Sequence, residues 1–241
     1  MGEPSTPKAI VFDLDNTLFD HHHSLRCAIS AVQSRYPALA RKTPDELIGK
    51  YDAALQRAYD SYIRKEISYE QADENKVKEF FAAVGLAEPG LTEIKEFRAI
   101  YKRAYREALR ATPGSIETLS RLRERGYLLA ILTNGRTEDQ MEKADSIGVR
   151  HLVHHLITSE EAGCAKPDPR IFHLVLDRLG TSADATYMVG DSPSSDIKGA
   201  LDAGMSPILY CPSARDSQLS LFVENVLVVH HISQLLEHFG I

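Results

Sequence analysis

The second half of the chain alternates short apolar runs with amphipathic segments, and this alternation constrains the fold more than any other feature. The runs at 127–132 and 186–189 have the length and composition of buried strands, and apolar residues recur at helical spacing between them. Strands that alternate with helices form right-handed βαβ units around a parallel sheet. The full set of predicted elements is strands at 9–12, 127–132, 156–158, 186–189, 207–210 and 226–229, and helices at 115–125, 138–147, 169–179, 196–203 and 233–239.

The stretch between the first strand and this alternating region has a different pattern. It predicts four helices in succession, at 24–36, 44–63, 69–84 and 92–110. We therefore predict an α/β fold, a Rossmann-like three-layer sandwich with a parallel sheet, formed by 1–20 and 111–241. An α-helical domain at 21–110 is inserted into it. His21, His22 and His23 are expected in an extended connection into this insertion, where adjacent side chains cannot all face one metal ion.

Charge and composition limit the classes of partner. The net charge of −6 gives no footprint for nucleic acid or for an anionic membrane. The N-terminal segment Met1–Lys8 has no apolar signal core, and no later run is long enough to span a bilayer. The three cysteines are scattered and have no metal-binding spacing. We expect a cytoplasmic protein, monomer or homodimer, that acts on a small molecule and binds neither nucleic acid nor membrane.

Polar residues stand at the ends of several predicted strands. Asp13 and Asp15 follow the strand at 9–12, Thr133 and Asn134 end the strand at 127–132, and Asp191 follows the strand at 186–189. Ligands of open α/β sheets bind beyond the carboxyl ends of the strands, so these residues are expected to lie near one another.

A cluster of Asp13, Asp15 and Asp191 is costly unless a cation neutralises it, and oxygen ligands without sulfur favour Mg²⁺. The Thr133 hydroxyl and the backbone N–H groups that follow it suit an anion at a helix entrance. Lys166 adds a positive charge. Together these groups predict a site with a nucleophile, a metal ion and donors around a phosphoryl group.

The same residues carry a family resemblance. The segment Asp13–Thr17, with its D-x-D-x-T pattern, resembles the first motif of the haloacid dehalogenase superfamily, and Leu132–Gly135 resembles the second. Lys166-Pro167 resembles the third motif and Gly190–Asp196 the fourth. Their order and spacing match from about Ala9 to the C-terminus. Within the superfamily the chain is similar to phosphatases with a helical cap, such as acylneuraminate-phosphate phosphatases, pyrimidine nucleotidases and phosphoglycolate phosphatases.

The resemblance implies a Mg²⁺-dependent phosphatase that hydrolyses a small phosphate monoester through an aspartyl-phosphate. Asp13 would be the nucleophile, and Asp15 would be the general acid and then the base. Thr133, Asn134 and Lys166 would hold the phosphoryl oxygens.

The resemblance also implies a metal site and a division of labour between the domains. Mg²⁺ would be held by the carboxylates of Asp13 and Asp191 and by the backbone carbonyl of Asp15. Asp196 would support the metal directly or through water. The domain formed by 1–20 and 111–241 would be the catalytic core, and the insertion at 21–110 would be the cap.

Three alternatives share this fold. A 2-haloacid dehalogenase needs neither a metal nor a proton donor two residues after the nucleophile, so Asp15, Asp191 and Asp196 argue against it. A phosphoglucomutase-type phosphoryl transferase would keep the same core residues. A non-catalytic protein that binds a phosphate ligand should lack a catalytic residue, and none is missing.

Overall fold

The computed structural model describes residues 9–212 and 226–241, which form two compact units. One unit is Met1–Asp20 with Arg110–Ile241, and the other is His21–Leu109. The predicted polar segment Met1–Lys8 lies outside the described residues. We describe each unit by itself and call them the α/β unit and the helical unit.

The α/β unit is built on a parallel six-stranded sheet in the order β3-β2-β1-β4-β5-β6. The central strand β1 pairs with β2 through Ala9↔Leu128 and with β4 through Ala9↔Thr186. The strands are β1 Ala9–Phe12, β2 Leu128–Thr133, β3 His155–Thr158, β4 Thr186–Gly190, β5 Ser206–Tyr210 and β6 Leu227–Val229. All four residues of β1 are buried, as expected for a strand that is covered on both faces.

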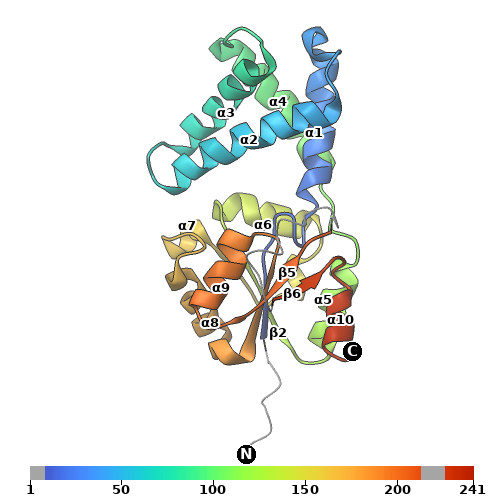
Figure 1. Cartoon of the computed structure of the whole chain (residues 1–241), viewed down its shortest axis with the longest axis vertical. Helices are drawn as coiled ribbons and strands as arrows, with labels where there is room; N and C mark the ends of the chain where they lie inside the picture. The colour runs from blue at the N-terminus through green and yellow to red at the C-terminus, as the bar shows by residue number, and fades with distance from the viewer. Residues whose placement is uncertain (1–8, 213–225) are drawn as a thin grey trace, which may run out of the picture. The chain divides into compact units, whose positions relative to one another are not determined.

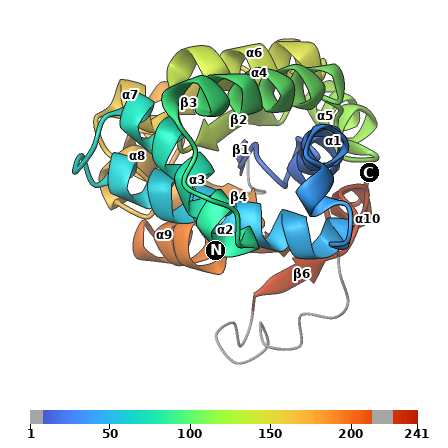
Figure 2. The ribbon, with the colours of Figure 1, turned by 90° about the horizontal axis from the view of Figure 1, so that it is seen from above.

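Helices cover both faces of this sheet. Helices α5 and α6 lie on one side and α8 and α9 on the other (Figures 1 and 2). Val11, Ala130 and Met188 pack with Phe172 and Val175 of α8 in one apolar cluster. The helices are α5 Ser115–Glu124, α6 Thr137–Ser146, α7 Ser159–Ala162, α8 Pro169–Leu179, α9 Lys198–Asp202 and α10 Gln234–His238, with short helical turns η2 Arg150–Leu152, η3 Ala183–Ala185 and η4 Pro193–Ile197. The predicted Rossmann-like α/β fold is therefore confirmed.

The order of the strands fixes where a ligand can bind. The chain runs outward from β1 through β2 to β3, and then crosses back to β4 on the other side of β1. This reversal makes the carboxyl ends of β1 and β4 a topological switch point, where α/β sheets bind their ligands. Asp13 follows β1 and Asp191 follows β4 at this point.

The chain leaves and re-enters the α/β unit at neighbouring points. The Asp20 N–H donates to the Arg110 carbonyl at 3.1 Å, and the Arg110 guanidinium pairs with the Asp20 carboxylate at 2.6 Å. Phe19 forms an antiparallel bridge with Ala111, and the Thr112 N–H donates to the Leu18 carbonyl. The two crossings are thus joined to each other within the α/β unit.

The helical unit contains the four long helices that the periodicity predicts. They are α1 His21–Arg35, α2 Pro44–Ile63, α3 Tyr69–Val84 and α4 Leu91–Glu107, with a short turn, η1, at Pro37–Leu39. Thr43 caps α2, and Ser68 and Gln71 form a capping box at the start of α3. Tyr51, Phe80 and Phe97 are fully buried at the centre of the apolar core of this unit. Among the described residues, no helix combines the length and apolar composition that crossing a bilayer would require.

A buried carboxylate in the helical unit is surrounded by three cations. The Asp73 side chain on α3 is 1% exposed, and it pairs with Lys76 at 2.6 Å, with Lys102 at 3.1 Å and with Arg98. Burial alone would raise the pKa of Asp73, but Lys76 and Lys102 outweigh it, so the pKa lies below its ordinary value. Asp73 therefore joins α3 to α4 as an ionised group.

Asp73→Asn should lower the free energy of unfolding by about 1–3 kcal/mol, because it removes the buried counter-charge of three cations that are only partly exposed. The depressed pKa gives the sign of the pH dependence. The stabilisation is present at neutral pH and is lost as pH falls through the folded-state pKa. The difference between wild type and variant should therefore shrink below about pH 4. Urea denaturation followed by far-UV circular dichroism at several pH values measures both effects.

Glu79→Gln is the matched control for this prediction. It breaks the exposed Arg57–Glu79 pair between α2 and α3, which is worth less than about 1 kcal/mol. Equal losses in the two variants would contradict the role given to Asp73.

Two local predictions were wrong. His21, His22 and His23 form the first turn of α1 instead of an extended connection, and the His21 ring bonds the Tyr105 hydroxyl at 2.7 Å. The predicted helix at 196–203 is divided into a π-helical turn and the short helix α9. The cause lies in Pro193 and in Ser192, whose hydroxyl accepts from the Ser195 N–H and begins the helical turn earlier.

Candidate active site

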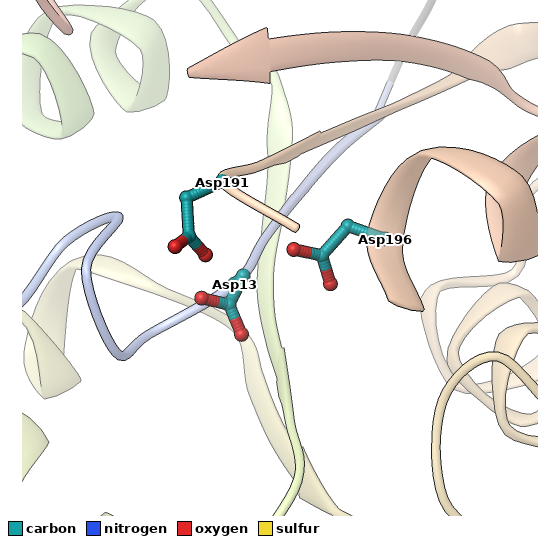
Figure 3. Close-up of side chains that lie close together, drawn as sticks. All are labelled: Asp13, Asp191 and Asp196. Atoms are coloured by element: carbon teal, nitrogen blue, oxygen red, sulfur yellow. The ribbon is translucent and has the colours of Figure 1, made fainter. Parts of the chain in front are cut away.

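Three carboxylates meet at the switch point of the sheet (Figure 3). Asp13 follows β1, Asp191 follows β4, and Asp196 belongs to η4. One oxygen from each lies within 4.8 Å of the others. The Asp13 N–H donates to the Val189 carbonyl of β4 at 2.9 Å, which keeps the end of β1 beside β4. The parallel pairing of these two strands therefore brings Asp13 and Asp191 together.

The turn after β4 brings Asp196 back to the same point. The Ser192 N–H donates to Asp196 Oδ2 at 3.1 Å, and the Asp196 N–H donates to the Ser192 carbonyl at 2.9 Å. A Cβ atom on Gly190 would overlap the Asp196 carboxyl group. Glycine at this position therefore makes room for the third carboxylate.

Lys166 links two of the three carboxylates. Its Nζ donates to Asp13 Oδ1 at 2.6 Å and to Asp196 Oδ1 at 2.7 Å, and its side chain is 3% exposed. The Asn134 side chain holds the Lys166 backbone, because its Nδ2 donates to the Lys166 carbonyl at 3.1 Å and its Oδ1 accepts from the Lys166 N–H at 2.8 Å. The ends of β2 and β1 are thereby connected through one lysine.

Crowding and burial shift the proton affinities of these groups. Burial raises the pKa of Asp13 to about 7, against the opposing charge of Lys166 and with the help of Asp196. Burial and the Asp13 carboxylate also raise the pKa of Asp191 well above its ordinary range. Burial alone would lower the pKa of Lys166, but Asp13 and Asp196 outweigh it and raise that pKa. The site is thus short of positive charge.

The donor set fits a divalent cation of the Mg²⁺ type. When all are ionised, Asp13, Asp15, Asp191 and Asp196 carry four negative charges, against the two positive charges of Lys166 and Lys143, so a charge of −2 would need a cation to offset it. Carboxylate oxygens are the ligands that Mg²⁺ prefers. The Asp15 side chain lies outside the group of three, since its Oδ1 accepts from Lys143 Nζ at 2.6 Å. Its expected metal contact through the backbone carbonyl involves a different atom and stays a prediction.

The second motif lies beside this cluster at the end of β2. Thr133 is 1% exposed, and its hydroxyl lies 3.4 Å from Gln140 Oε1. The Gly135 N–H, a predicted donor to an anion, instead donates to the Ser159 hydroxyl at 2.9 Å. Helix α6 begins after Arg136, so neither Thr133 nor Asn134 serves as its N-cap.

Sequence reasoning missed two residues of α6 that contact the predicted site. Gln140 is 3% exposed, and its Nε2 donates to the Asn134 carbonyl at 3.4 Å. Lys143, one turn later, pairs with Asp15. One sequence signal could have indicated Gln140. It occupies the same helix face as Ala144 and Ile147, which are apolar and buried, so a polar residue there was unexpected.

Comparison with known proteins defines the class of this chain. Residues 7–204 match the family model described as haloacid dehalogenase-like hydrolase. Because the match covers most of the chain, the protein belongs to that family and is an enzyme of the hydrolase class. The predicted family is confirmed.

Individual relatives span nearly the whole chain. Glyceraldehyde 3-phosphate phosphatase from Methanothermobacter thermautotrophicus is 31% identical over 95% of this chain and 98% of its own length. Ribulose-1,5-bisphosphate 5-phosphatase from Halopiger xanaduensis is also 31% identical and covers 85% of each chain. The crystal structure of the HAD-hydrolase YfnB from Bacillus subtilis, bound to magnesium, has a TM-score of 0.80 at 19% identity and covers 98% of this chain and all of that one. This last similarity shows a shared fold.

Proposed function

We propose that the protein is a Mg²⁺-dependent phosphatase that hydrolyses a small-molecule phosphate monoester through an aspartyl-phosphate on Asp13. The observation that carries this proposal is the contact of Lys166 Nζ with Asp13 at 2.6 Å beside the carboxylates of Asp191 and Asp196. A buried carboxylate in contact with an ammonium group can attack an electrophile, and the same ammonium group can stabilise an anionic oxygen.

In the first step, an Asp13 oxygen forms a bond to phosphorus while the bond from phosphorus to the leaving oxygen breaks. The leaving oxygen takes a proton from the Asp15 carboxyl group, and the alcohol departs. In the second step, Asp15 takes a proton from water, whose oxygen attacks phosphorus. Asp13 is then released as a carboxylate together with inorganic phosphate, so one water molecule is consumed in each cycle.

Lys166 and the end of β2 would hold the phosphoryl oxygens. The lysine is already in contact with the proposed nucleophile, and Thr133 stands at the carboxyl end of the neighbouring strand. The Asn134 side chain acts through Lys166, because its Nδ2 and Oδ1 both form hydrogen bonds with the lysine backbone. We therefore assign its contribution to fixing Lys166, with any direct phosphate contact made by its backbone N–H.

Asp13, Asp191 and the backbone carbonyl of Asp15 would hold Mg²⁺, supported by Asp196 directly or through water. When bound, the ion neutralises the carboxylates and lets an anionic phosphate approach them. Asp196 also accepts a hydrogen bond from Lys166 at 2.7 Å, so it would fix the lysine at a set position beside the metal site.

The relatives support small, polar phosphate esters as the substrate class. The names of two of them specify phosphates of short sugars, glyceraldehyde 3-phosphate and ribulose 1,5-bisphosphate. We extend this chemistry to the present chain and assign the role of cap to the helical unit, His21–Leu109. A cytoplasmic location and a monomeric or homodimeric state belong to the same proposal.

A panel of phosphate esters with Mg²⁺ tests the function. The panel contains sugar phosphates, nucleoside monophosphates, phosphoglycolate and p-nitrophenyl phosphate, and released inorganic phosphate is measured. We expect turnover of several members, with kcat/KM highest for one class of natural ester. Acid quenching during turnover, followed by borohydride reduction, should convert phosphorylated Asp13 to homoserine, which mass spectrometry detects.

The alternatives give different products in parallel assays. A dehalogenase would release halide from a 2-haloacid without added metal. A phosphoryl transferase would convert a hexose 1-phosphate to a hexose 6-phosphate with little inorganic phosphate. A non-catalytic protein would bind an ester and leave it intact. Any of these results, without phosphate release from the panel, would overturn the phosphatase assignment.

A further inference from the structure

We infer that Lys143 is a positioning residue for the proposed phosphatase reaction, on which this inference rests. Lys143 holds the Asp15 carboxyl group where it can exchange a proton with the leaving oxygen. It lies on α6, far from Asp15 in sequence, and none of the four sequence motifs includes it.

The contact between Lys143 and Asp15 is short and partly shielded from solvent. Lys143 Nζ donates to Asp15 Oδ1 at 2.6 Å, and the two side chains are 18% and 30% exposed. The same ammonium group lies 5.4 Å from the centre of the Phe19 ring, which is fully buried. A cation over an aromatic face is attracted to it, so Lys143 is held from two sides.

Both partners of Lys143 belong to one loop. Asp15 and Phe19 form a bridge, and the Asn16 N–H donates to the Phe19 carbonyl at 2.9 Å. Asn16 has a φ of 63°, a left-handed conformation that turns the chain directly after Asp15. Lys143 thus contacts the loop at both ends of this turn, and a change in the loop would alter both contacts.

The helix that carries Lys143 is itself fixed to the sheet. The Thr137 hydroxyl bonds the Thr158 hydroxyl of β3 at 2.7 Å, and the Thr137 N–H donates to Glu160 Oε2 at 2.9 Å. Gln140, one turn before Lys143, bonds the Asn134 carbonyl. The ammonium group therefore extends from a rigid support, as a positioning residue must.

A carboxyl group has two oxygens, so Oδ1 of Asp15 can stay with Lys143 while the second oxygen exchanges the proton. Proton transfer requires that oxygen within hydrogen-bond distance of the leaving oxygen. Without Lys143, the Asp15 side chain samples other rotamers, and only a fraction of the molecules have the productive one. The effect should appear only where the reaction needs the proton from Asp15.

The experiment compares Lys143→Met and Lys143→Arg with wild type on esters of different leaving groups, with saturating Mg²⁺. The kcat/KM value reports the steps up to loss of the alcohol. We expect Lys143→Met to lose about 10²-fold in kcat/KM on an alkyl phosphate, which is the usual loss when a catalytic group is misplaced. On 2,4-dinitrophenyl phosphate, whose leaving group departs without a proton, the loss should be under about 3-fold. Lys143→Arg should regain part of the alkyl activity, because it keeps the positive charge and N–H donors for the Asp15 carboxylate.

A double-mutant cycle with Asp15→Asn tests whether Lys143 acts through Asp15. In the Asp15→Asn background, Lys143→Met should lower kcat/KM on the alkyl ester by a further factor of less than about 2. A loss as large as in wild type would show that Lys143 contacts substrate directly. An equal loss on alkyl and dinitrophenyl esters would show that it only supports the fold. Both results overturn the inference.

Controls separate failure of this inference from failure of the proposed function. Wild-type phosphate release that is lost in Asp13→Asn establishes the phosphatase, whatever Lys143 does. Arg178→Met breaks an exposed ion pair with Glu161 in the same unit. It should leave kcat/KM unchanged on both the alkyl and the dinitrophenyl ester. If Lys143→Met does not fold by circular dichroism, Lys143→Gln, which keeps a polar end, replaces it in the same cycle.

Discussion

Replacing Asp13 by Asn is expected to reduce phosphate-ester turnover by about 10⁴-fold or more, the size of the loss seen when an enzyme is deprived of its nucleophile. Asparagine has nearly the same shape and keeps an oxygen that can accept from Lys166 Nζ, now 2.6 Å from Asp13 Oδ1. The amide oxygen is a poor nucleophile, so attack on phosphorus fails while the fold is retained. The loss should appear in kcat for every ester, good leaving groups included.

Initial rates with p-nitrophenyl phosphate and with the best natural ester measure this loss, and circular dichroism verifies the fold. Asp177→Asn on the exposed side of α8 is the matched control and should retain wild-type rates. If Asp13 were only a general base for water, its loss would still cost about 10²–10⁴-fold. A loss of less than about 10-fold would therefore show that Asp13 is neither the nucleophile nor a general base.

Removal of divalent metal with EDTA is expected to abolish turnover, and Mg²⁺ should restore it. Without a cation, burial and neighbouring carboxylates raise the pKa of Asp13 to about 7, so a large share of this group is protonated at neutral pH. A cation among Asp13, Asp191 and Asp196 would keep them ionised and would offset the charge of −2. Ca²⁺ should bind but support little activity, because its larger and looser coordination shell misplaces the nucleophile.

The same Mg²⁺ titration is followed by phosphatase activity and by thermal unfolding. A ligand that binds only the folded state stabilises it by about 2.7 kcal/mol at 100 times its Kd, so Mg²⁺ should raise Tm in the wild type. Asp191→Asn replaces a charged carboxylate by a neutral amide, which binds a divalent cation less tightly, and should abolish most of this shift. Full phosphatase activity in EDTA, or an unchanged Tm with Mg²⁺ in wild type, would contradict the metal site.

Most of the fold could be predicted because the pattern of apolar residues is explicit. The helices at 44–63, 69–84 and 169–179 have the predicted bounds, since each begins with a capping residue and ends at a change of pattern. The errors arose where side chains compete with the pattern. His21–His23 carry no apolar signal, yet they start α1, and Pro193 with its serines converts the expected helix start into a π-helical turn.

The candidate site was partly visible in the sequence. Asp13, Asp191 and Lys166 stand at strand ends or in the loops beside them, and parallel pairing brings such ends together. Their catalytic and metal-binding roles stay predictions. Contacts that depend on the packing of a helix could not be read in advance. Lys143 looks like any surface lysine until α6 is placed against the loop at Asp15, and the Asn134 amide could not be assigned to the Lys166 backbone.

The joined crossings at Asp20 and Arg110 have a consequence for how such chains change over evolutionary time. A segment whose entry and exit are hydrogen-bonded to each other can be lengthened, exchanged or lost without moving the strands on either side. Asp13 lies seven residues before the exit, and its position is set by the pairing of β1 with β4, so the bridge between Phe19 and Ala111 closes the α/β unit independently of the length of the inserted segment. If the helical unit contacts the leaving group, as we propose, new leaving groups can be sampled by replacing one contiguous segment, while the residues proposed to act on phosphorus keep their positions.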